Sequence, residues 1–370
     1  MQSFKIGLQY MEQFELGKIV EPLLCWYDAN ARILPWREEP TAYRVWVSEI
    51  MLQQTRVEAV KPYYERFMKA LHDVDTLAKA EEETLLKLWE GLGYYNRVRN
   101  LNKAAIQIME QYEGVIPDTY EALCALPGIG SYTAGAVASI AYHRCVPAVD
   151  GNVLRVISRI RLDERDILQA SVKKSVEQDL KQIMPHDRPG DFNQALMELG
   201  ATVCIPNGEP KCGECPWNAF CMAREKGCMT DYPKKAPKKA RVIEYKPILV
   251  LQDEQKTALQ KRPSKGLLAG MYEFPWMEGI QDEDSVLTYL KELGLQAIHI
   301  KRLEDSKHVF SHKEWHMTGY AIRVDELERS GDKSGLLFVE REETQDRYAI
   351  PAAYAAYTGY LNIKLGNERF

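Results

Sequence analysis

The sequence has no long uninterrupted apolar run. Of its 370 residues 45% are hydrophobic, yet no stretch approaches the ~18 consecutive apolar residues that a membrane helix requires. The first residues also lack the basic-then-apolar pattern and the small-residue cleavage site of a secretory signal. We therefore expect a protein of the cytoplasm that has no membrane partner.

The chain also lacks an excess of positive charge, because its formal net charge is −5. Basic chains bind nucleic acid more readily, so the total argues mildly against a polyanion partner. A sum over the chain does not exclude a local basic surface, however. Basic residues gather at two places, which are Arg97, Arg99 and Lys103, and then Lys234, Lys235, Lys238, Lys239 and Arg241.

Alternating strand patterns are missing from the first part of the chain. From about Ile19 to Arg224 the apolar residues recur at helical spacing, as in "YRVWVSEIMLQQTRVEAV". The lysine- and proline-containing stretch "TDYPKKAPKKARVIEYK" predicts an exposed linker. Beyond it, "YKPILVLQD", "KTALQKR", "AIHIKRL", "HMTGYAIRV" and "GLLFVERE" predict strands, and "EDSVLTYLKELG" predicts a helix.

These patterns predict an all-α domain followed by an α+β domain. The length of 370 residues also favours two domains over one. The expected boundaries are an N-terminal extension at 1–17, the helical domain at 18–229, a basic linker at 230–243 and the second domain at 244–370.

Eight cysteines are present, and four of them fall in one short segment with the spacing C-x7-C-x2-C-x5-C. These are Cys204, Cys212, Cys215 and Cys221. In a cytoplasmic protein such clustering favours a metal site over disulfides. Tetrahedral zinc and a four-iron cluster both accept four cysteines. Zinc ribbons usually pair two C-x2-C units and only one occurs here, which favours iron–sulfur.

The stretch "LPGIGSYTAGAVASIAY" places a Pro-Gly turn before an apolar helix. A P-loop would need a lysine after the glycines, and a dinucleotide fold would need a third glycine at Thr133 and a preceding strand. The pattern fits a turn between two helices, whose backbone at Gly128 and Gly130 could approach a phosphate. A plain helix–helix turn fits it as well.

Two carboxylates stand out. Glu49 lies on an apolar helix face, where a charge is costly unless it is paired or protonated. Asp150 directly precedes a predicted helix, a position typical of an N-cap. If the two share a cleft, they form a proton donor and a fixed negative charge, as reactions through a sugar oxocarbenium ion require.

Together, the glycine turn, the aspartate in "VDGN" and the four-cysteine segment resemble the endonuclease III superfamily of DNA glycosylases. Within it, "LPWR", "WVSEIMLQQTRV" and "WEGLGYYNRVRN" resemble the MutY family of adenine DNA glycosylases. The resemblance covers nearly all of the chain after about residue 18. It implies a helix-hairpin-helix fold with a [4Fe-4S] cluster, followed by a Nudix-like domain that recognises the lesion.

The resemblance also implies the activity, which is removal of adenine mispaired with 8-oxoguanine or guanine in double-stranded DNA. The enzyme would be a monomer associated with the nucleoid, and it would flip the base out of the helix first. Glu49 would be the general acid, Asp150 would stabilise the sugar cation and Asn152 would orient the site. Tyr132 occupies the place of the lysine that lyases need, so no Schiff base could form and the strand would stay intact.

The resemblance assigns further roles. Substrate contacts would come from Trp36, Arg37, Gln54, Thr55, Leu92, Tyr94, Gln194, Phe310, Ser311 and His312. Gly128 and Gly130 would contact the DNA backbone, and Cys204, Cys212, Cys215 and Cys221 would hold the cluster. The family spaces its first two cysteines by six residues, whereas seven separate them here, and Cys228 lies nearby as an alternative ligand.

The second domain departs from a working Nudix hydrolase. Most of the magnesium-binding glutamates are missing, because Leu287-Thr288 and Lys291-Glu292 occupy their places. The triplet His308, His312 and His316 would form a metal face on a helix, but its apolar neighbours indicate strand and loop. The alternatives to this function are an endonuclease III-type glycosylase/lyase, a nucleotide pyrophosphatase in the second domain, and a non-catalytic DNA-binding module.

Overall fold

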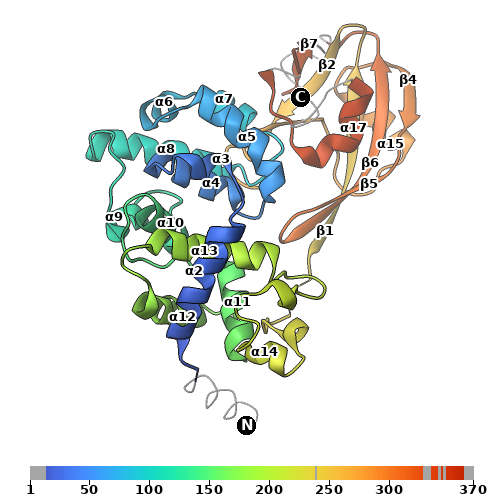
Figure 1. Cartoon of the computed structure of the whole chain (residues 1–370). Coiled ribbons are helices and arrows are strands. Elements are labelled where there is room, and N and C mark those ends of the chain that lie inside the picture. Colours follow the sequence, from blue (N-terminus) through green and yellow to red (C-terminus); the bar gives the residue numbers. More distant parts are fainter. Residues whose placement is uncertain (1–13, 238–239, 328–334, 341–342, 345–346, 362–370) are drawn as a thin grey trace. The chain divides into compact units, whose positions relative to one another are not determined.

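The computed structural model describes residues 14–237, 240–327, 335–340, 343–344 and 347–361 (Figure 1). By their contacts the residues form two compact units. The first comprises the chain up to Lys79 together with Asn100–Pro237, and the second comprises Ala80–Arg99 together with the chain from Lys238 onward. Most of the predicted N-terminal extension (1–13) and two linker lysines, Lys238 and Lys239, lie outside the described residues.

The first unit is helical throughout its described part, as the sequence predicts (Figure 1). Its longer helices are α2 (Val20–Asn30), α4 (Ala42–Leu52), α5 (Val57–Ala70), α8 (Asn96–Gln111, whose first four residues belong to the second unit), α10 (Ser131–Ile140), α11 (Gly151–Arg161), α12 (Ala170–Ile183) and α13 (Pro189–Thr202). Short helical turns are η1 (Leu16–Ile19), α3 (Pro35–Glu38), α6 (Val74–Lys79), α9 (Tyr120–Cys124), η2 (Cys212–Glu214), α14 (Met222–Glu225) and η3 (Met229–Asp231).

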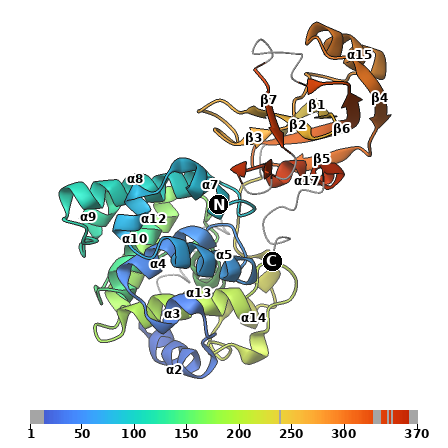
Figure 2. The same ribbon diagram turned by 90° about the horizontal axis from the view of Figure 1, so that it is seen from above.

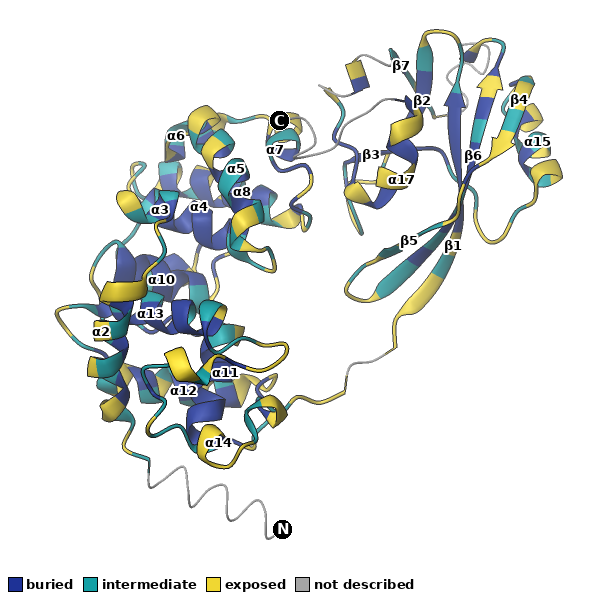
Figure 3. Cartoon of the chain, turned by 45° about the vertical axis from the view of Figure 1, so that its right-hand side comes forward, coloured by how far each residue is buried: buried dark blue, intermediate teal, exposed yellow. Residues whose placement is uncertain are grey.

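Helix α11 runs through the core of this unit. Every residue from Val153 to Arg161 is buried, and its apolar side chains pack with those of α2, α12 and α13. Figure 3 shows α4, α10 and α13 with mainly buried surfaces as well. Since α4 carries Glu49, α10 carries Tyr132 and α11 begins after Asp150, the core positions all three residues.

The glycine turn connects α9 to α10, as predicted. Gly128 has a φ of +77°, and a Cβ there would lie 2.6 Å from the Cβ of Asn100 on α8. Gly130 precedes α10 in an extended conformation with open space around its Cα. Gly135 lets α10 approach the segment before Asp150, because its Cβ would lie 2.3 Å from the carbonyl oxygen of Pro147.

The second unit is built on a mixed sheet (Figure 2). Its strands are β1 (Val242–Gln252), β2 (Lys256–Lys261), β3 (Tyr272–Glu273), β4 (Ala297–Arg302), β5 (Ser306–Val309), β6 (Lys313–Val324) and β7 (Leu337–Glu340). The order is β3-β2-β1-β6-β4, with β5 paired to β6 and β7 paired to β2. Strands β1 and β6 run parallel over their full length, and the remaining pairs are antiparallel.

The alternation of β1 and β6 creates two cores, one on each face of the sheet. Leu249, Leu251 and Ile322 face α15 (Glu283–Glu292). On the opposite face, Ile248, Val250 and Met317 pack with the C-terminal turns. These turns are η6 (Ala352–Tyr354), α17 (Ala355–Thr358) and η7 (Gly359–Leu361). The unit also contains α7 (Glu82–Leu88), which comes from the middle of the helical sequence.

The predicted fold class, helical first and sheet-containing second, is confirmed. All five predicted strands and the helix at 283–292 form, and β5 lies where the neighbours of His308 indicate strand and loop, whereas β3 was not predicted. His308 and His316 lie on adjacent strands, with His312 in the turn between them, so the three histidines do not form a helical face. Among the described helices, none is long and apolar enough to cross a membrane.

Candidate active site

Glu49 is buried in the first unit and contacts Tyr132. Its side chain is 6% exposed, and the Tyr132 hydroxyl donates a hydrogen bond to its Oε2. The same hydroxyl lies 3.0 Å from the sulfur of Met197. Burial raises the pKa of Glu49 to about 7, even though the hydrogen bond from Tyr132 acts in the opposite direction. A carboxyl group with this pKa can donate a proton near neutral pH.

Asp150 caps the N-terminus of α11. Its Oδ1 accepts hydrogen bonds from the backbone N–H groups of Asn152 and Val153, both at 2.9 Å. Its Oδ2 accepts a third at 2.7 Å from the side-chain amide of Asn152. Burial raises the pKa of Asp150, while these donors and the charge of Arg155 favour its ionised form. The N-cap expected from the sequence therefore also lies within electrostatic range of Glu49 and Tyr132.

A line of hydrogen bonds connects Asp150 to the cysteine segment. Arg155 is buried, and its Nη2 donates to the Oδ1 of Asn152 at 2.9 Å and to the carbonyl of Gly200 at 2.8 Å. Its Nε donates to the carbonyl of Cys204 at 2.9 Å. Arg155 thereby connects the Asn152 amide to the backbone at Gly200 and Cys204.

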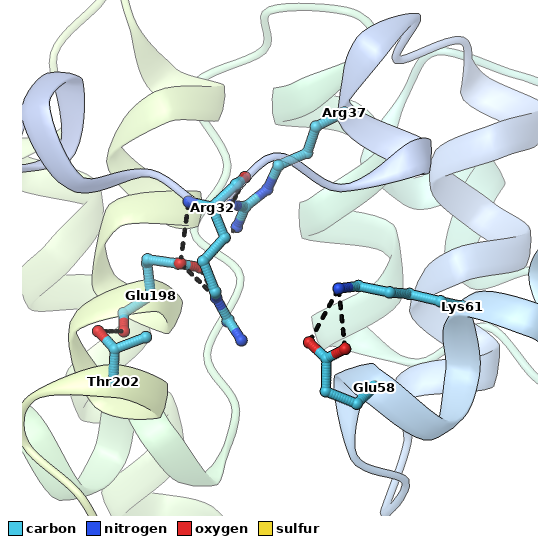
Figure 4. A network of polar contacts seen from close by, with 6 residues as sticks. All are labelled: Arg32, Arg37, Glu58, Lys61, Glu198 and Thr202. Carbon is cyan, nitrogen blue, oxygen red and sulfur yellow. Dashed lines mark hydrogen bonds and ion pairs between the residues drawn. The ribbon is translucent and has the colours of Figure 1, made fainter.

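Two arginines converge on one buried carboxylate, Glu198 of α13 (Figure 4). Arg32 binds Glu198 in a bidentate manner, with Nε–Oε1 and Nη2–Oε2 distances of 2.5 and 3.0 Å. The Nη2 of Arg37 lies 2.9 Å from Oε2, and its Nη1 donates to the carbonyl of Arg32. Burial alone would raise the pKa of Glu198, but the two guanidinium groups outweigh it and lower the pKa.

Arg37 and Gln194, both predicted to contact the base, line one pocket together with Tyr27, His143 and Arg188. The guanidinium of Arg37 also lies 5.7 Å from the centroid of the Tyr27 ring. Trp36 is 5% exposed and packs edge-on against Tyr64 of α5. The pocket thus combines an aromatic wall with fixed donors, as recognition of a planar base requires.

The two residues predicted to enter the DNA helix, Gln54 in the first unit and Tyr94 in the second, both have a left-handed backbone conformation. Gln54, after α4, is exposed and has a φ of +58°. Tyr94 of the second unit is 51% exposed and has a φ of +49°. Left-handed backbone at a non-glycine residue costs of order 1–3 kcal/mol and concentrates at functional sites. Thr55 closes the turn at Gln54 through its backbone N–H, which donates to the carbonyl of Leu52.

In the second unit, Tyr94 lies beside the residues predicted to read the lesion. Its hydroxyl is 3.1 Å from the Oγ of Ser311. Ser311 and His312 are exposed in the turn between β5 and β6, whereas Phe310 packs edge-on against Trp315. Leu92 is 7% exposed, so its side chain lies mainly inside the unit.

The helix-hairpin-helix offers backbone donors at the start of α10. The space beside the Cα of Gly130 is open. Nearby, the Nζ of Lys173 lies 2.9 Å from the Oγ of Ser131. A lysine beside a helix N-terminus adds positive potential where N–H groups are free to bind an anion. By contrast, the Arg99 guanidinium binds Glu82 and the carbonyl of Ala269 in the second unit.

The four clustered cysteines line a single pocket. Cys204, Cys212, Cys215 and Cys221 all border it, together with Arg159 and Arg224. Burial raises the pKa of Cys215 to about 12 and raises the pKa values of Cys212 and Cys221 as well. A metal centre binds thiolates, and its positive charge would offset this burial.

Within the part of the chain that the structure describes, no group of three or more His, Cys, Asp or Glu side chains is arranged to hold a single metal ion. Four thiols around one pocket are the donor set of an iron–sulfur cluster and equally of tetrahedral zinc. Cys228 packs with Leu162 and Tyr232 and does not border the pocket.

The sequence analysis missed three polar residues of this site, which are Arg32, Arg155 and Glu198. Glu198 follows apolar residues in "FNQALMELG", which is the signal that identified Glu49. Arg155 lies among apolar residues of α11 in the same way. A charged residue on a predicted apolar face therefore indicates a residue of this site at Glu198 and Arg155 as well as at Glu49.

Comparison with known proteins gives the same two-part division. Residues 47–186 match the family model described as HhH-GPD superfamily base excision DNA repair protein, and residues 248–358 match the NUDIX domain model. Among solved structures, a thermostable thymine-DNA glycosylase matches 57% of this chain and 97% of its own at 28% identity, with a TM-score of 0.51. An endonuclease III–DNA covalent intermediate matches 58% of this chain and 97% of its own, with 22% identity and a TM-score of 0.50, which supports the fold.

Similar curated proteins cover most of the chain. The adenine DNA glycosylase of Mus musculus is 35% identical over 94% of this chain and 78% of its own length. That of Buchnera aphidicola subsp. Acyrthosiphon pisum (strain APS) is 33% identical over 82% of this chain and 85% of its own. Adenine DNA glycosylases hydrolyse the N-glycosidic bond of adenine in DNA as part of base excision repair. With its helical site and its Nudix-like second unit, this chain belongs to the adenine DNA glycosylase family.

Proposed function

We propose that the chain excises adenine paired with 8-oxoguanine, and more slowly adenine paired with guanine, without cutting the DNA strand. The observation that carries this proposal is the contact of the buried, protonatable Glu49 with a phenol, that of Tyr132. Glu49 supplies an acid that can protonate the leaving base. Residue 132 is a tyrosine, so no amine nucleophile stands at that position.

Glu49 acts as the general acid. Adenine is a poor leaving group as an anion, so a proton must reach its ring as the N-glycosidic bond breaks. The raised pKa of Glu49, about 7, keeps a substantial fraction of the carboxyl protonated in a neutral solution. After transfer, the hydrogen bond from Tyr132 stabilises the carboxylate that is left behind.

Asp150 stabilises the positive charge that develops on the sugar. Its carboxylate is fixed by three hydrogen bonds, so it needs no reorganisation when the charge forms. Asn152 binds it directly, and Arg155 in turn binds the Asn152 amide. A water molecule then adds to the sugar cation and loses a proton, which returns to the Glu49 carboxylate, so that the acid is restored and an abasic site in an intact strand remains.

The base and its partner are recognised separately. Arg37 and Gln194 line one pocket and would supply donors and an acceptor for the flipped adenine. Gln54 and Tyr94 enter the helix near the mismatch from backbone turns that expose them. Ser311 and His312 can hydrogen-bond the N7–H and O8 that distinguish 8-oxoguanine from guanine.

Four cysteines, Cys204, Cys212, Cys215 and Cys221, would hold a [4Fe-4S] cluster. Such a group would cross-link the loop between α13 and α14 and add stability to it. The chain's own residues then complete the support, since Arg155 and Arg159 bind the carbonyls of Cys204 and Ile205.

The second unit recognises the lesion and does not hydrolyse nucleotides. In α15, Leu287, Thr288 and Lys291 stand where a Nudix hydrolase carries metal-binding carboxylates. This favours the glycosylase over a pyrophosphatase in the second unit, and Tyr132 favours a monofunctional enzyme over a glycosylase/lyase.

The test uses the full-length protein and duplexes that contain one A:8-oxoguanine, A:G or A:T pair. Free adenine and strand breaks are measured separately, before and after alkali. We expect adenine from the first two duplexes, fastest from A:8-oxoguanine, and strand breaks only after alkali. Glu49→Gln should lower the rate by ~100-fold or more, as loss of a general acid does.

Two results would overturn the proposal. If no adenine is released from the A:8-oxoguanine duplex, the substrate is wrong. If strand scission keeps pace with base release, or if borohydride traps a covalent adduct, the enzyme is a lyase. The presence of Tyr132 would then not indicate an enzyme that leaves the strand intact.

A further inference from the structure

Residues 80–99 lie inside the range matched by the HhH-GPD family model, yet by their contacts they belong to the second unit. This segment contains α7 and the loop at residues 89–95, which we term the mismatch-probing loop because it carries Tyr94. The structure therefore places one of the residues assigned to the mismatch in the same compact unit as the turn that carries Ser311.

Glu90 connects the base of this loop to the rest of the unit. It is 2% exposed, and its Oε1 accepts a hydrogen bond of 2.9 Å from the backbone N–H of Ile350, which is itself fully buried. The Nζ of Lys87 lies 3.2 Å from its other oxygen. A buried carboxylate is costly unless it is paired, and here both its charge and its hydrogen-bonding capacity are used by the segment at 348–350 and by α7.

Two further contacts hold the same segment. The Nζ of Lys87 donates to the carbonyl of Tyr348 at 2.9 Å, and Arg99 donates to the carbonyl of Ala269. Gly270 leaves room beside this contact, because a Cβ there would lie 3.0 Å from the Arg99 Nη2 and the guanidinium would have to shift slightly. The segment is thus fixed before the loop by Lys87, at the start of the loop by Glu90 and after the loop by Arg99.

The mismatch-probing loop is itself braced. The indole N–H of Trp89 donates to the carbonyl of Gly93 at 3.1 Å. The Nη2 of Arg97 donates to the carbonyls of Leu92 and Gly93 at 3.0 and 3.1 Å. These bonds tie the backbone just before Tyr94, which has the left-handed conformation, to Trp89 and Arg97 on either side of the loop.

We propose that Glu90 is a positioning residue, which anchors the mismatch-probing loop to the backbone of Ile350 so that Tyr94 and Ser311 meet the lesion as one preformed surface. The proposal rests on the proposed function, because it assumes that these two residues contact the mismatch. It extends that function by assigning the preference for 8-oxoguanine to the anchor as well as to the contacting side chains.

The experiment compares Glu90→Leu and Glu90→Gln in the full-length protein. Leucine leaves the buried N–H of Ile350 without an acceptor, whereas glutamine retains a carbonyl oxygen in its place. Lys87→Met tests the same anchor through a second residue. The matched control is Glu81→Leu, because Glu81 is exposed at the start of α7 and makes no capping hydrogen bond.

Two measurements are made on each variant. Amide hydrogen exchange at Ile350 reports whether the anchor opens, independently of activity. The ratio of single-turnover rates on A:8-oxoguanine and A:G duplexes reports lesion preference. For Glu90→Leu we expect exchange at Ile350 to accelerate roughly tenfold or more, which is the size expected for an unsatisfied buried N–H.

The rate ratio of Glu90→Leu should fall by a similar factor, and that of Lys87→Met should fall in the same direction. Glu90→Gln should stay within about threefold of the original chain in both measurements, and Glu81→Leu should match it.

The outcomes separate the two proposals. If the original chain releases no adenine from either duplex, the proposed function fails whatever Ile350 does. If the original chain is active and Glu90→Leu exposes the Ile350 amide but keeps its rate ratio, the anchor does not set lesion preference and this inference is wrong. Unchanged hydrogen exchange at the Ile350 amide in Glu90→Leu would also overturn the inference, because the hydrogen bond from Ile350 to Glu90 would then not hold the two segments together.

Discussion

Replacing Tyr132 with phenylalanine should move the pH dependence of base release to higher pH. The Tyr132 hydroxyl donates to Glu49, and this hydrogen bond lowers the pKa of the carboxyl group because it stabilises the charged form. Phenylalanine keeps the ring in place but removes the donor. Burial then acts with less opposition, so the pKa of Glu49 should rise above its present value of about 7.

The size of the shift follows from the strength of the bond. A hydrogen bond to a charged acceptor contributes ~1.5–3 kcal/mol, and one pKa unit corresponds to about 1.36 kcal/mol. The expected rise is therefore about 1–2 units. Since the general acid must be protonated, activity falls as pH rises through its pKa, and the alkaline limb of the rate profile should move upward by that amount.

The assay is single-turnover adenine release with enzyme in excess, measured over the range about pH 5 to 10 around the acid's pKa. Tyr142→Phe is the matched control, because its hydroxyl donates to the carbonyl of Ile116 and not to Glu49. A limb that moves downward would refute the sign of the argument. Loss of all activity at every pH would show that the Tyr132 hydroxyl has a chemical role beyond tuning Glu49.

Three further predictions concern stability and the cluster. Between pH ~4.5 and ~7 Glu49 is ionised in the unfolded chain but protonated in the folded chain, so the free energy of unfolding falls as the pH rises. Glu49→Gln removes this effect. In denaturant titrations the variant should be more stable than the original chain by up to about 3 kcal/mol at pH ~8 and should differ little at pH ~4. Gly128→Ala should lose about 1–3 kcal/mol of unfolding free energy through its φ of +77° and its contact with Asn100, whereas Gly130→Ala should lose little. Cys215→Ser should abolish the iron–sulfur absorbance at about 400 nm, and Cys228→Ser should retain it.

Much of this arrangement can be predicted from the sequence because it depends on local rules. The periodicity of α4 places Glu49 on an apolar face, and the Asp150 cap follows from an aspartate before a helix. The apolar residues around His308 and His316 identify strands. The spacing of four cysteines selects one segment for a metal centre. Each of these features involves residues that are near one another in the chain.

The tertiary structure alone decided which of these elements meet. Tyr132 reaches Glu49 across 83 residues because α10 packs on α4, and Arg32 reaches Glu198 across 166 because α2 packs on α13. The same packing explains why a buried charge is tolerated, which no local pattern can show. It also groups residues 80–99 with the second unit, where Glu90 binds Ile350.

The sequence by itself therefore determined the helices, most of the strands and the cysteine segment, and it predicts which carboxyl group is the acid. Its local patterns could not set the pKa of Glu49, the left-handed turns at Gln54 and Tyr94 or the anchor at Glu90. Those depend on burial and on hydrogen bonds between distant segments, and such contacts exist only once the chain has packed.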